Sequence, residues 1–95
     1  MYRHETNKLH KAARSPAFLL VVSEHAERQM ADRDIARFEV EEVLKAGVVV
    51  MIELDPTGAE RWRVAGRDAD GHRIEVVVEL LPPTMAELIT VIRIG

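Results

Sequence analysis

Residues 36–54, ARFEVEEVLKAGVVVMIEL, contain the change of pattern that decides the fold. Up to Lys45 the apolar residues recur every three or four positions, which is the spacing of one helix face. After Gly47, a common residue at a helix end, the chain becomes a run of branched aliphatic residues that is typical of a β-strand. The stretch therefore predicts a helix over residues 36–45 followed directly by a strand over residues 48–54.

Downstream of this stretch, alternating segments are separated by turn sequences. Asp55–Gly58 and Asp68–Gly71 are strong turn signals, and Leu81–Thr84 with its two prolines is a third break. Between these breaks apolar and polar residues alternate, as in strands that have one buried face. The intervals fit hairpins, so the sequence predicts an antiparallel meander. Its expected strands are residues 48–54, 60–66, 72–80 and 87–94.

Upstream of this stretch, a short apolar run precedes a second amphipathic segment. Residues 17–22, AFLLVV, are continuously apolar and predict a buried strand. Ser23 follows as an N-cap, which predicts a helix over residues 24–33 with Ala26 and Met30 on its inner side. We therefore expect an α+β fold, with two helices packed on one face of a curved antiparallel meander sheet of four to five strands.

Length and composition indicate one ordinary domain. The chain has 95 residues, 47% of them apolar, and no cysteine, which excludes disulfides, thiolate catalysis and Cys-type zinc sites. No apolar run is long enough to span a membrane, so we expect a cytoplasmic protein without a membrane partner. We assign the domain to residues 16–95. Residues 1–15 form a basic segment, for which a packed helix and a mobile tail both remain open.

The charge is distributed unevenly. Residues 1–15 have four basic residues and one acid and so carry +3, which leaves −6 on the remainder of a chain with net charge −3. An acidic body argues against general nucleic-acid binding, which normally relies on a basic surface. A polyanion site would therefore have to be a local patch.

One combination of motifs resembles a known family. The motifs are SEHAERQMADR at residues 23–33, RWRVAG at 61–66, DGHR at 70–73 and ITVI at 89–92. With these motifs the chain resembles, over residues 18–94, domain-of-unknown-function family 4258, although His72 separates the glycine and the arginine of one motif.

This family is similar to the BrnT and RelE groups of toxin ribonucleases. That relation implies helices on one face of a curved antiparallel sheet, and RNA cleavage that needs no metal and no cofactor. It also implies a cognate antitoxin protein that covers the site. Toxin ribonucleases of these groups are usually basic, whereas this chain has a net charge of −3.

The first candidate catalytic residues lie on the predicted helix 24–33. His25 is in the first turn, where the helix dipole favours the neutral imidazole that can accept a proton from a ribose 2′-hydroxyl. Arg28 lies one turn further along the same face, and Arg33 ends the helix, so both could offset charge in a transition state. The alternatives are a hydrogen bond from His25 to a strand end, an Arg28–Asp32 pair, and helix-dipole complementation by Arg33.

The second group consists of arginines on the predicted strands. Arg61 is assigned to catalysis, and Arg63, Arg73 and Arg93 to RNA-phosphate binding. Arg61 and Arg63 are two residues apart and share a face, and we expect the other two arginines on that face and His25 within reach, directly or through one water. Trp62 should point the other way, into the core. The alternative is cross-strand pairing with Glu53, Glu60, Glu75 or Glu79.

Two functional hypotheses remain open. The first is a toxin-type, metal-independent endoribonuclease or RNA-binding domain that has a cognate antitoxin. The second is a catalytically silent domain for protein interaction or homodimerisation. We expect no metal, because no carboxylate–histidine spacing indicates a site, and no cofactor.

Overall fold

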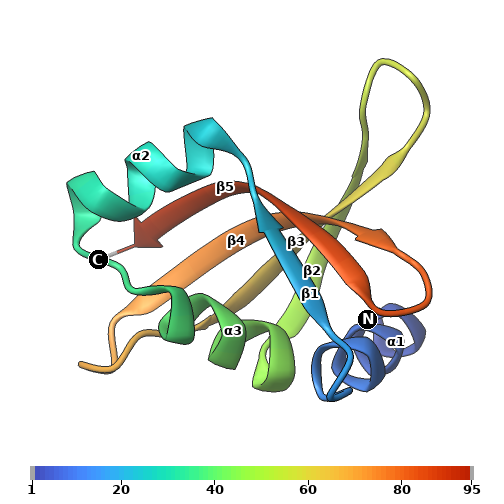
Figure 1. Cartoon of the computed structure of the whole chain (residues 1–95), viewed down its shortest axis with the longest axis horizontal. Helices are drawn as coiled ribbons and strands as arrows, with labels where there is room; N and C mark the ends of the chain where they lie inside the picture. The colour runs from blue at the N-terminus through green and yellow to red at the C-terminus, as the bar shows by residue number, and fades with distance from the viewer. Residues whose placement is uncertain (1, 95) are drawn as a thin grey trace.

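The computed structural model describes residues 2–94, and over that range it contains three helices and one five-stranded sheet (Figure 1). The predicted α+β class, with helices on a largely antiparallel meander sheet, is confirmed. Strands follow the order β1-β5-β4-β3-β2, and the sheet does not close into a barrel. In chain order the elements are α1 (Arg3–Ala13), β1 (Leu19–Val22), α2 (Glu24–Arg33), α3 (Arg37–Ala46), β2 (Val48–Leu54), β3 (Glu60–Arg67), β4 (Arg73–Leu81) and β5 (Met85–Ile94).

β1 departs from the expected antiparallel arrangement. It lies parallel to β5, with Leu20 beside Ala86, and the Leu19 amide donates a 2.9 Å hydrogen bond to the Thr84 carbonyl. A parallel pair requires a long connection. Here α2, α3 and the strands β2, β3 and β4 supply it, so the sheet is mixed, with one parallel pair at its edge.

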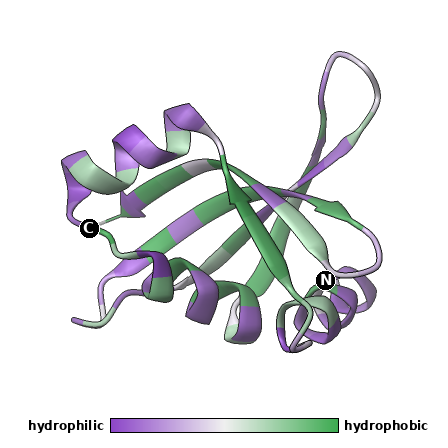
Figure 2. Ribbon diagram, in the orientation of Figure 1, coloured by the Kyte–Doolittle hydropathy of each residue, from purple (hydrophilic) through white to green (hydrophobic). Residues whose placement is uncertain are grey.

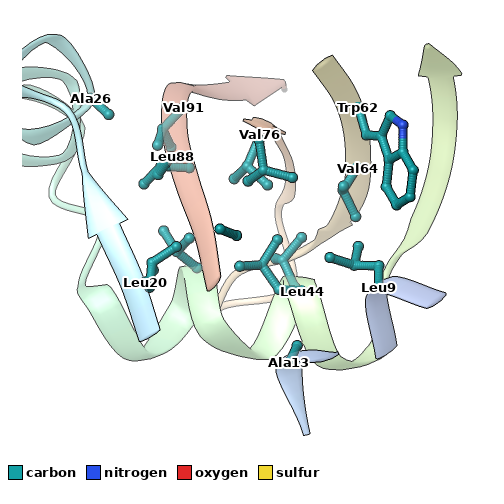
Figure 3. Close-up of a cluster of buried hydrophobic side chains, with 14 of the residues drawn as sticks. Leu9, Ala13, Leu20, Ala26, Leu44, Trp62, Val64, Val76, Leu88 and Val91 are labelled. Atoms are coloured by element: carbon teal, nitrogen blue, oxygen red, sulfur yellow. The ribbon is translucent and has the colours of Figure 1, made fainter. Parts of the chain in front are cut away.

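The core lies between one face of the sheet and the helices (Figure 3). Leu9 of α1, Leu44 of α3 and Ala26 of α2 are fully buried against the sheet. Trp62 points into this core as predicted, and its indole N–H donates to the Glu60 carboxylate at 3.0 Å. Each large aliphatic side chain buried in this way contributes about 1.5–3 kcal/mol of transfer free energy.

Hydropathy follows the same layering. In Figure 2 the strands are largely hydrophobic, whereas α2 and α3 carry hydrophilic residues on their outer sides. α2 lies beside β5, and the β2–β3 hairpin extends away from the three helices (Figure 1). The helices therefore leave part of the sheet to be covered by its own side chains.

α1 is attached to the end of α3. The His10 Nε2 atom lies 2.7 Å from the Gly47 carbonyl oxygen, and the Arg14 guanidinium donates two hydrogen bonds, of 3.0 and 2.7 Å, to the Lys45 carbonyl. The last carbonyls of a helix have no partner within the helix, so α1 satisfies them. These basic side chains of the N-terminal segment thus have a structural role, together with the buried Leu9.

Gly47 marks the abrupt change from helix to strand that the sequence predicted. A side chain there would place its Cβ 2.5 Å from the Val43 carbonyl oxygen and 2.6 Å from that of Ala65. Because both neighbours are backbone atoms, they could not move aside cheaply. Glycine is therefore required by close packing of α3 against β3.

Candidate functional site

The face of the sheet opposite the core is called the open face here. Core residues alternate along each strand with residues that point to this other side. The helices pack into the core, so the open face is covered only by strand side chains. Its members are Leu19 and Val21 of β1, Val48, Met51 and Glu53 of β2, Arg61, Arg63, Ala65 and Arg67 of β3, Arg73, Glu75, Val77, Glu79 and Leu81 of β4, and Met85, Glu87, Thr90, Ile92 and Ile94 of β5.

Exposed apolar side chains gather on the open face. Among the described residues eight large apolar side chains are markedly exposed, and six of them belong to this face. The other two are Phe38 on α3 and Leu54 on the β2–β3 hairpin. Exposed apolar side chains concentrated on one face of a protein indicate an interaction surface. The six are Leu19, Val21, Val48, Met51, Leu81 and Ile94.

Ion pairs occupy two of the arginines at the centre of the open face. Arg63 lies between Glu53 and Glu75, with N–O distances of 3.4 and 3.3 Å. Arg73 binds the second carboxylate oxygen of Glu75 at 2.9 Å. Glu75 is only 7% exposed, so these two cations compensate a buried charge. The alternative of cross-strand pairing therefore describes Arg63, whereas Arg73 pairs with Glu75 along its own strand.

Arg61 is held more loosely. Its closest acidic partner is Asp55, at 3.6 Å and without a hydrogen bond between the described side chains. The Thr57 hydroxyl, chiefly, and the Ala59 amide donate hydrogen bonds of 2.7 and 2.9 Å to the Asp55 carboxylate and lower its pKa, with the Arg61 charge acting in the same direction. Asp55 is thus ionised at neutral pH. The hydrogen bonds of its turn all reach Oδ1, and Oδ2 faces Arg61 at 3.6 Å, so Arg61 is loosely paired and keeps donors that an external anion could accept.

A hollow of about 300 Å³ lies beside these arginines. It is open on one side and combines positive, negative and apolar walls, so a ligand there would contact charged and apolar groups together. Residues from the hairpin, the central strands and β5 line it: Glu53, Leu54, Asp55, Pro56, Arg61, Arg63, Val77, Ile89 and Thr90.

Two glutamates on the open face have no cation within the described part of the chain. Glu79 of β4 and Glu87 of β5 lie directly opposite each other in the antiparallel register. Neither forms an ion pair or a side-chain hydrogen bond with any residue of 2–94. Like charges directly opposite across strands destabilise a sheet. The sequence shows two acids in alternating strands, but only the register shows that they face each other.

The helix candidates do not join the strand arginines. His25 is exposed on α2 and makes no hydrogen bond or ion pair with any described residue. Arg28 pairs with Glu24 at 3.8 Å, in place of the Asp32 partner considered above. Arg33 is half-buried at the last position of α2. The expected direct contact between His25 and a strand arginine is therefore absent from residues 2–94, and none of the helix candidates lines the hollow.

The expectation that Arg93 shares the open face is wrong. A β-bulge between β4 and β5 inserts Ile89 into the ladder, so Val91 returns to the core and Arg93 follows it to that side. There Arg93 lies opposite the buried Ile74 and its guanidinium is 3.2 Å from the Asp68 carboxylate. Strict alternation without the bulge would have placed Arg93 beside the other arginines.

The β3–β4 turn holds a group of polar residues that the sequence indicated as a turn and a family motif but not as a site. Burial of Asp68 acts to raise its pKa. Two effects outweigh burial and lower the pKa: hydrogen bonds from the amides of His72 and Asp70, at 2.8 and 2.9 Å, and the charges of His72 and Arg93. Ligand atoms of Asp68, Asp70 and His72 lie within 4.8 Å of one another, a spacing that a metal ion could bridge. Arg93 already supplies the positive charge at this position, which accounts for the ionised carboxylate without a metal.

No helix in residues 2–94 is long and apolar enough to cross a membrane. A family model described as Domain of unknown function (DUF4258) matches residues 22–93, which confirms the resemblance drawn from the motifs. No curated protein and no solved structure matches the chain.

Proposed function

We propose that this chain, which belongs to the DUF4258 family of domains of unknown function, is a protein-interaction domain that binds through the open face. The observation that carries this proposal is the position of the exposed apolar residues. Six of the eight in residues 2–94 lie on one sheet face whose centre carries ion pairs. Apolar contacts around charged groups are the usual composition of a protein interface.

The balance of charge on the open face also supports a protein partner. Arginines of β3 and β4 alternate with glutamates of β2, β4 and β5, so the face presents both signs. A polyanion would meet repulsion from these carboxylates, whereas a protein surface of mixed charge can match both.

Site-specific photo-cross-linking tests this proposal. A photoreactive amino acid replaces Met51 on the open face or, as the control, Phe38 on α3; both positions are well exposed, at 46% and 59%. We expect a defined cross-linked protein from position 51 and none from position 38. Cross-linking from position 38 alone would contradict the proposal, and mass spectrometry of the product identifies the partner.

A second candidate function rests on Arg61. We propose, as that candidate, a metal-independent endoribonuclease or RNA-binding domain related to the BrnT and RelE toxins, with a cognate antitoxin as its partner. Arg61 and Arg63 line the hollow together with Thr90, and Arg61 has no hydrogen bond to its nearest carboxylate. A guanidinium with free donors is suited to phosphate, and the 2′-hydroxyl of RNA would serve as the nucleophile.

An RNA cleavage assay in the presence of EDTA tests the second candidate. The wild-type chain should cut single-stranded RNA to a 2′,3′-cyclic phosphate, and Arg61→Ala should lose about 10²–10³-fold in rate if it stabilises the transition state. His25→Ala tests the role predicted for the helix histidine. Absence of cleavage at any protein concentration would reject the second candidate, and wild-type activity in both variants would reject these residue assignments.

A further inference from the structure

We infer that the open face binds a basic segment of its protein partner, which places a lysine or arginine over Glu79 and Glu87 and apolar side chains over the residues beside them. The inference rests on the proposed interaction function and names the chemistry of the partner. The contact surface, called the acidic corner here, lies where β4, β5 and β1 adjoin on the open face. Its residues are Glu79, Glu87, Leu19, Val21, Leu81 and Met85.

The strand register makes the acidic corner a contiguous surface. Glu87 lies directly between Glu79 on β4 and Val21 on β1. In the next outward-facing row, Met85 lies between Leu81 and Leu19 in the same way. Neighbouring strands are about 4.8 Å apart and residues two apart along a strand are about 6.8 Å apart, so the two rows adjoin. Three exposed apolar side chains therefore lie beside the two carboxylates.

The two carboxylates have no counter-charge within residues 2–94. Arg61 is level with Glu79 on the neighbouring strand β3, because Trp62 lies opposite Val78. Its guanidinium nevertheless approaches Asp55, at 3.6 Å, and forms no ion pair with either glutamate. Like charges directly opposite across two strands destabilise a sheet. A cation from a partner would relieve this repulsion, which the fold itself leaves uncompensated.

The surroundings of the glutamates favour a basic side chain over other ligands of carboxylates. A nucleic acid or an anionic lipid surface is negative and would be repelled. A calcium ion takes about six to eight oxygen ligands, whereas the acidic corner offers two carboxylates among apolar side chains. Lysine and arginine combine an apolar stem with a charged head, so the stem can pack on Val21 or Leu81 while the head reaches the carboxylates.

Stability and binding should respond in opposite directions at the acidic corner. Replacing both glutamates, as Glu79→Gln with Glu87→Gln, removes the repulsion between them. This double variant should therefore have a higher urea midpoint than the wild-type chain, although it should lose the contact with a basic partner. A lower midpoint would show that the glutamates serve the fold, and it would overturn the inference.

Selection of peptides from a random-sequence display library on the immobilised chain, in the presence of EDTA, tests the binding. We expect enriched sequences to share a lysine or arginine flanked by apolar residues. A synthetic peptide of that sequence should bind the Glu79→Gln, Glu87→Gln variant at least about tenfold more weakly than the wild type, because a charge-assisted contact is lost. The matched control, Glu24→Gln with Glu27→Gln, removes the same charge from exposed positions on α2 and should bind like the wild type.

The selection separates this inference from the proposed function. Enriched peptides without a basic residue, or with unchanged affinity for the Glu79→Gln, Glu87→Gln variant, overturn the inference, and so does a library that yields no enriched peptide. Peptides that bind this variant normally but lose affinity for Met51→Glu would retain the open face as the binding surface and reject only the acidic corner.

Two measurements on the chain alone examine the other possible occupants. Titration calorimetry with calcium chloride should show no binding, and sedimentation equilibrium should show no self-association that depends on the two glutamates. Calcium binding or self-association that is present in the wild type and lost in the Glu79→Gln, Glu87→Gln variant would assign the acidic corner to a metal ion or to a second copy, and would overturn the inference.

Discussion

At the residue scale, Arg61 and Arg63 show how two neighbours on one strand face can have different roles. Arg63 bridges Glu53 and the buried Glu75, so it contributes to the charge balance of the fold. Arg61 meets only Asp55, at 3.6 Å and without a hydrogen bond, and the hydrogen bonds within the Asp55 turn reach the other carboxylate oxygen. The sequence presents both arginines in the same motif, and only their partners distinguish structural from available charge.

The two arginines should differ when each is replaced by alanine. Arg63→Ala should lower the free energy of unfolding by about 1 kcal/mol, because Glu75 keeps only one of its two cations. Arg61→Ala should change it by less than about 0.5 kcal/mol, as expected for a loosely paired surface residue. Urea denaturation measures both, and a larger loss for Arg61→Ala would contradict the assignment of roles.

Asp68 should make stability depend on pH. Its pKa in the folded chain is lowered from the ordinary 3.8, chiefly because amide hydrogen bonds and the charges of His72 and Arg93 outweigh desolvation. The contribution of Asp68 is therefore complete above about pH 3.8 and is lost as pH falls through the lower pKa of the folded state.

Asp68→Asn should accordingly lower the urea midpoint at pH 7 and reduce the further loss of stability on acidification below pH 4. Asp70→Asn is the matched control, because Asp70 is exposed in the same turn and its side chain accepts no hydrogen bond from residues 2–94. Equal midpoints for the two variants at pH 7 would show that the buried carboxylate contributes nothing.

At the element scale, local pattern predicted most of the fold. The change of period at Gly47, the alternation around Trp62 and the turn sequences all depend on residues close in the chain, and each of these predictions is confirmed. The parallel pairing of β1 and the bulge at Ile89 depend on contacts far apart in the sequence. The bulge places Arg93 on the core side instead of the predicted open face, because one extra residue reverses the facing of all later side chains in the strand.

The N-terminus of α2 offers a test of how this helix is held beside β5. The Ser23 hydroxyl accepts a 3.1 Å hydrogen bond from the Ala26 amide and donates one of 3.3 Å to the Ile89 carbonyl at the bulge. Ser23→Ala should lower the free energy of unfolding by about 1 kcal/mol, whereas Ser23→Asp, which retains the cap, should lose less. Equal losses in thermal or urea unfolding would show that the cap is unimportant.

At the scale of the whole molecule, the fold gives the sheet a side covered by helices and an open side. α1, α2 and α3 stabilise one side and cover it, and α1 also caps α3. The open face keeps exposed apolar residues around an ionic centre, although burying them would stabilise an isolated domain. A partner that covers this face would recover that stabilisation. The candidate site is thus a surface assembled from all five strands, which no single sequence motif could reveal.

Methyl NMR spectroscopy on the purified chain tests the central claim, that the open face is the binding surface, most directly. Spectra of isotope-labelled protein are recorded with and without the partner identified by cross-linking from position 51, and the shift of each methyl group on binding is mapped onto the structure. The account predicts changes at Leu19, Val21, Met51 and Leu81, with the core methyl groups of Leu44 unchanged. Shifts confined to the outer surfaces of α2 and α3, with the open face unaffected at saturating partner, would contradict it.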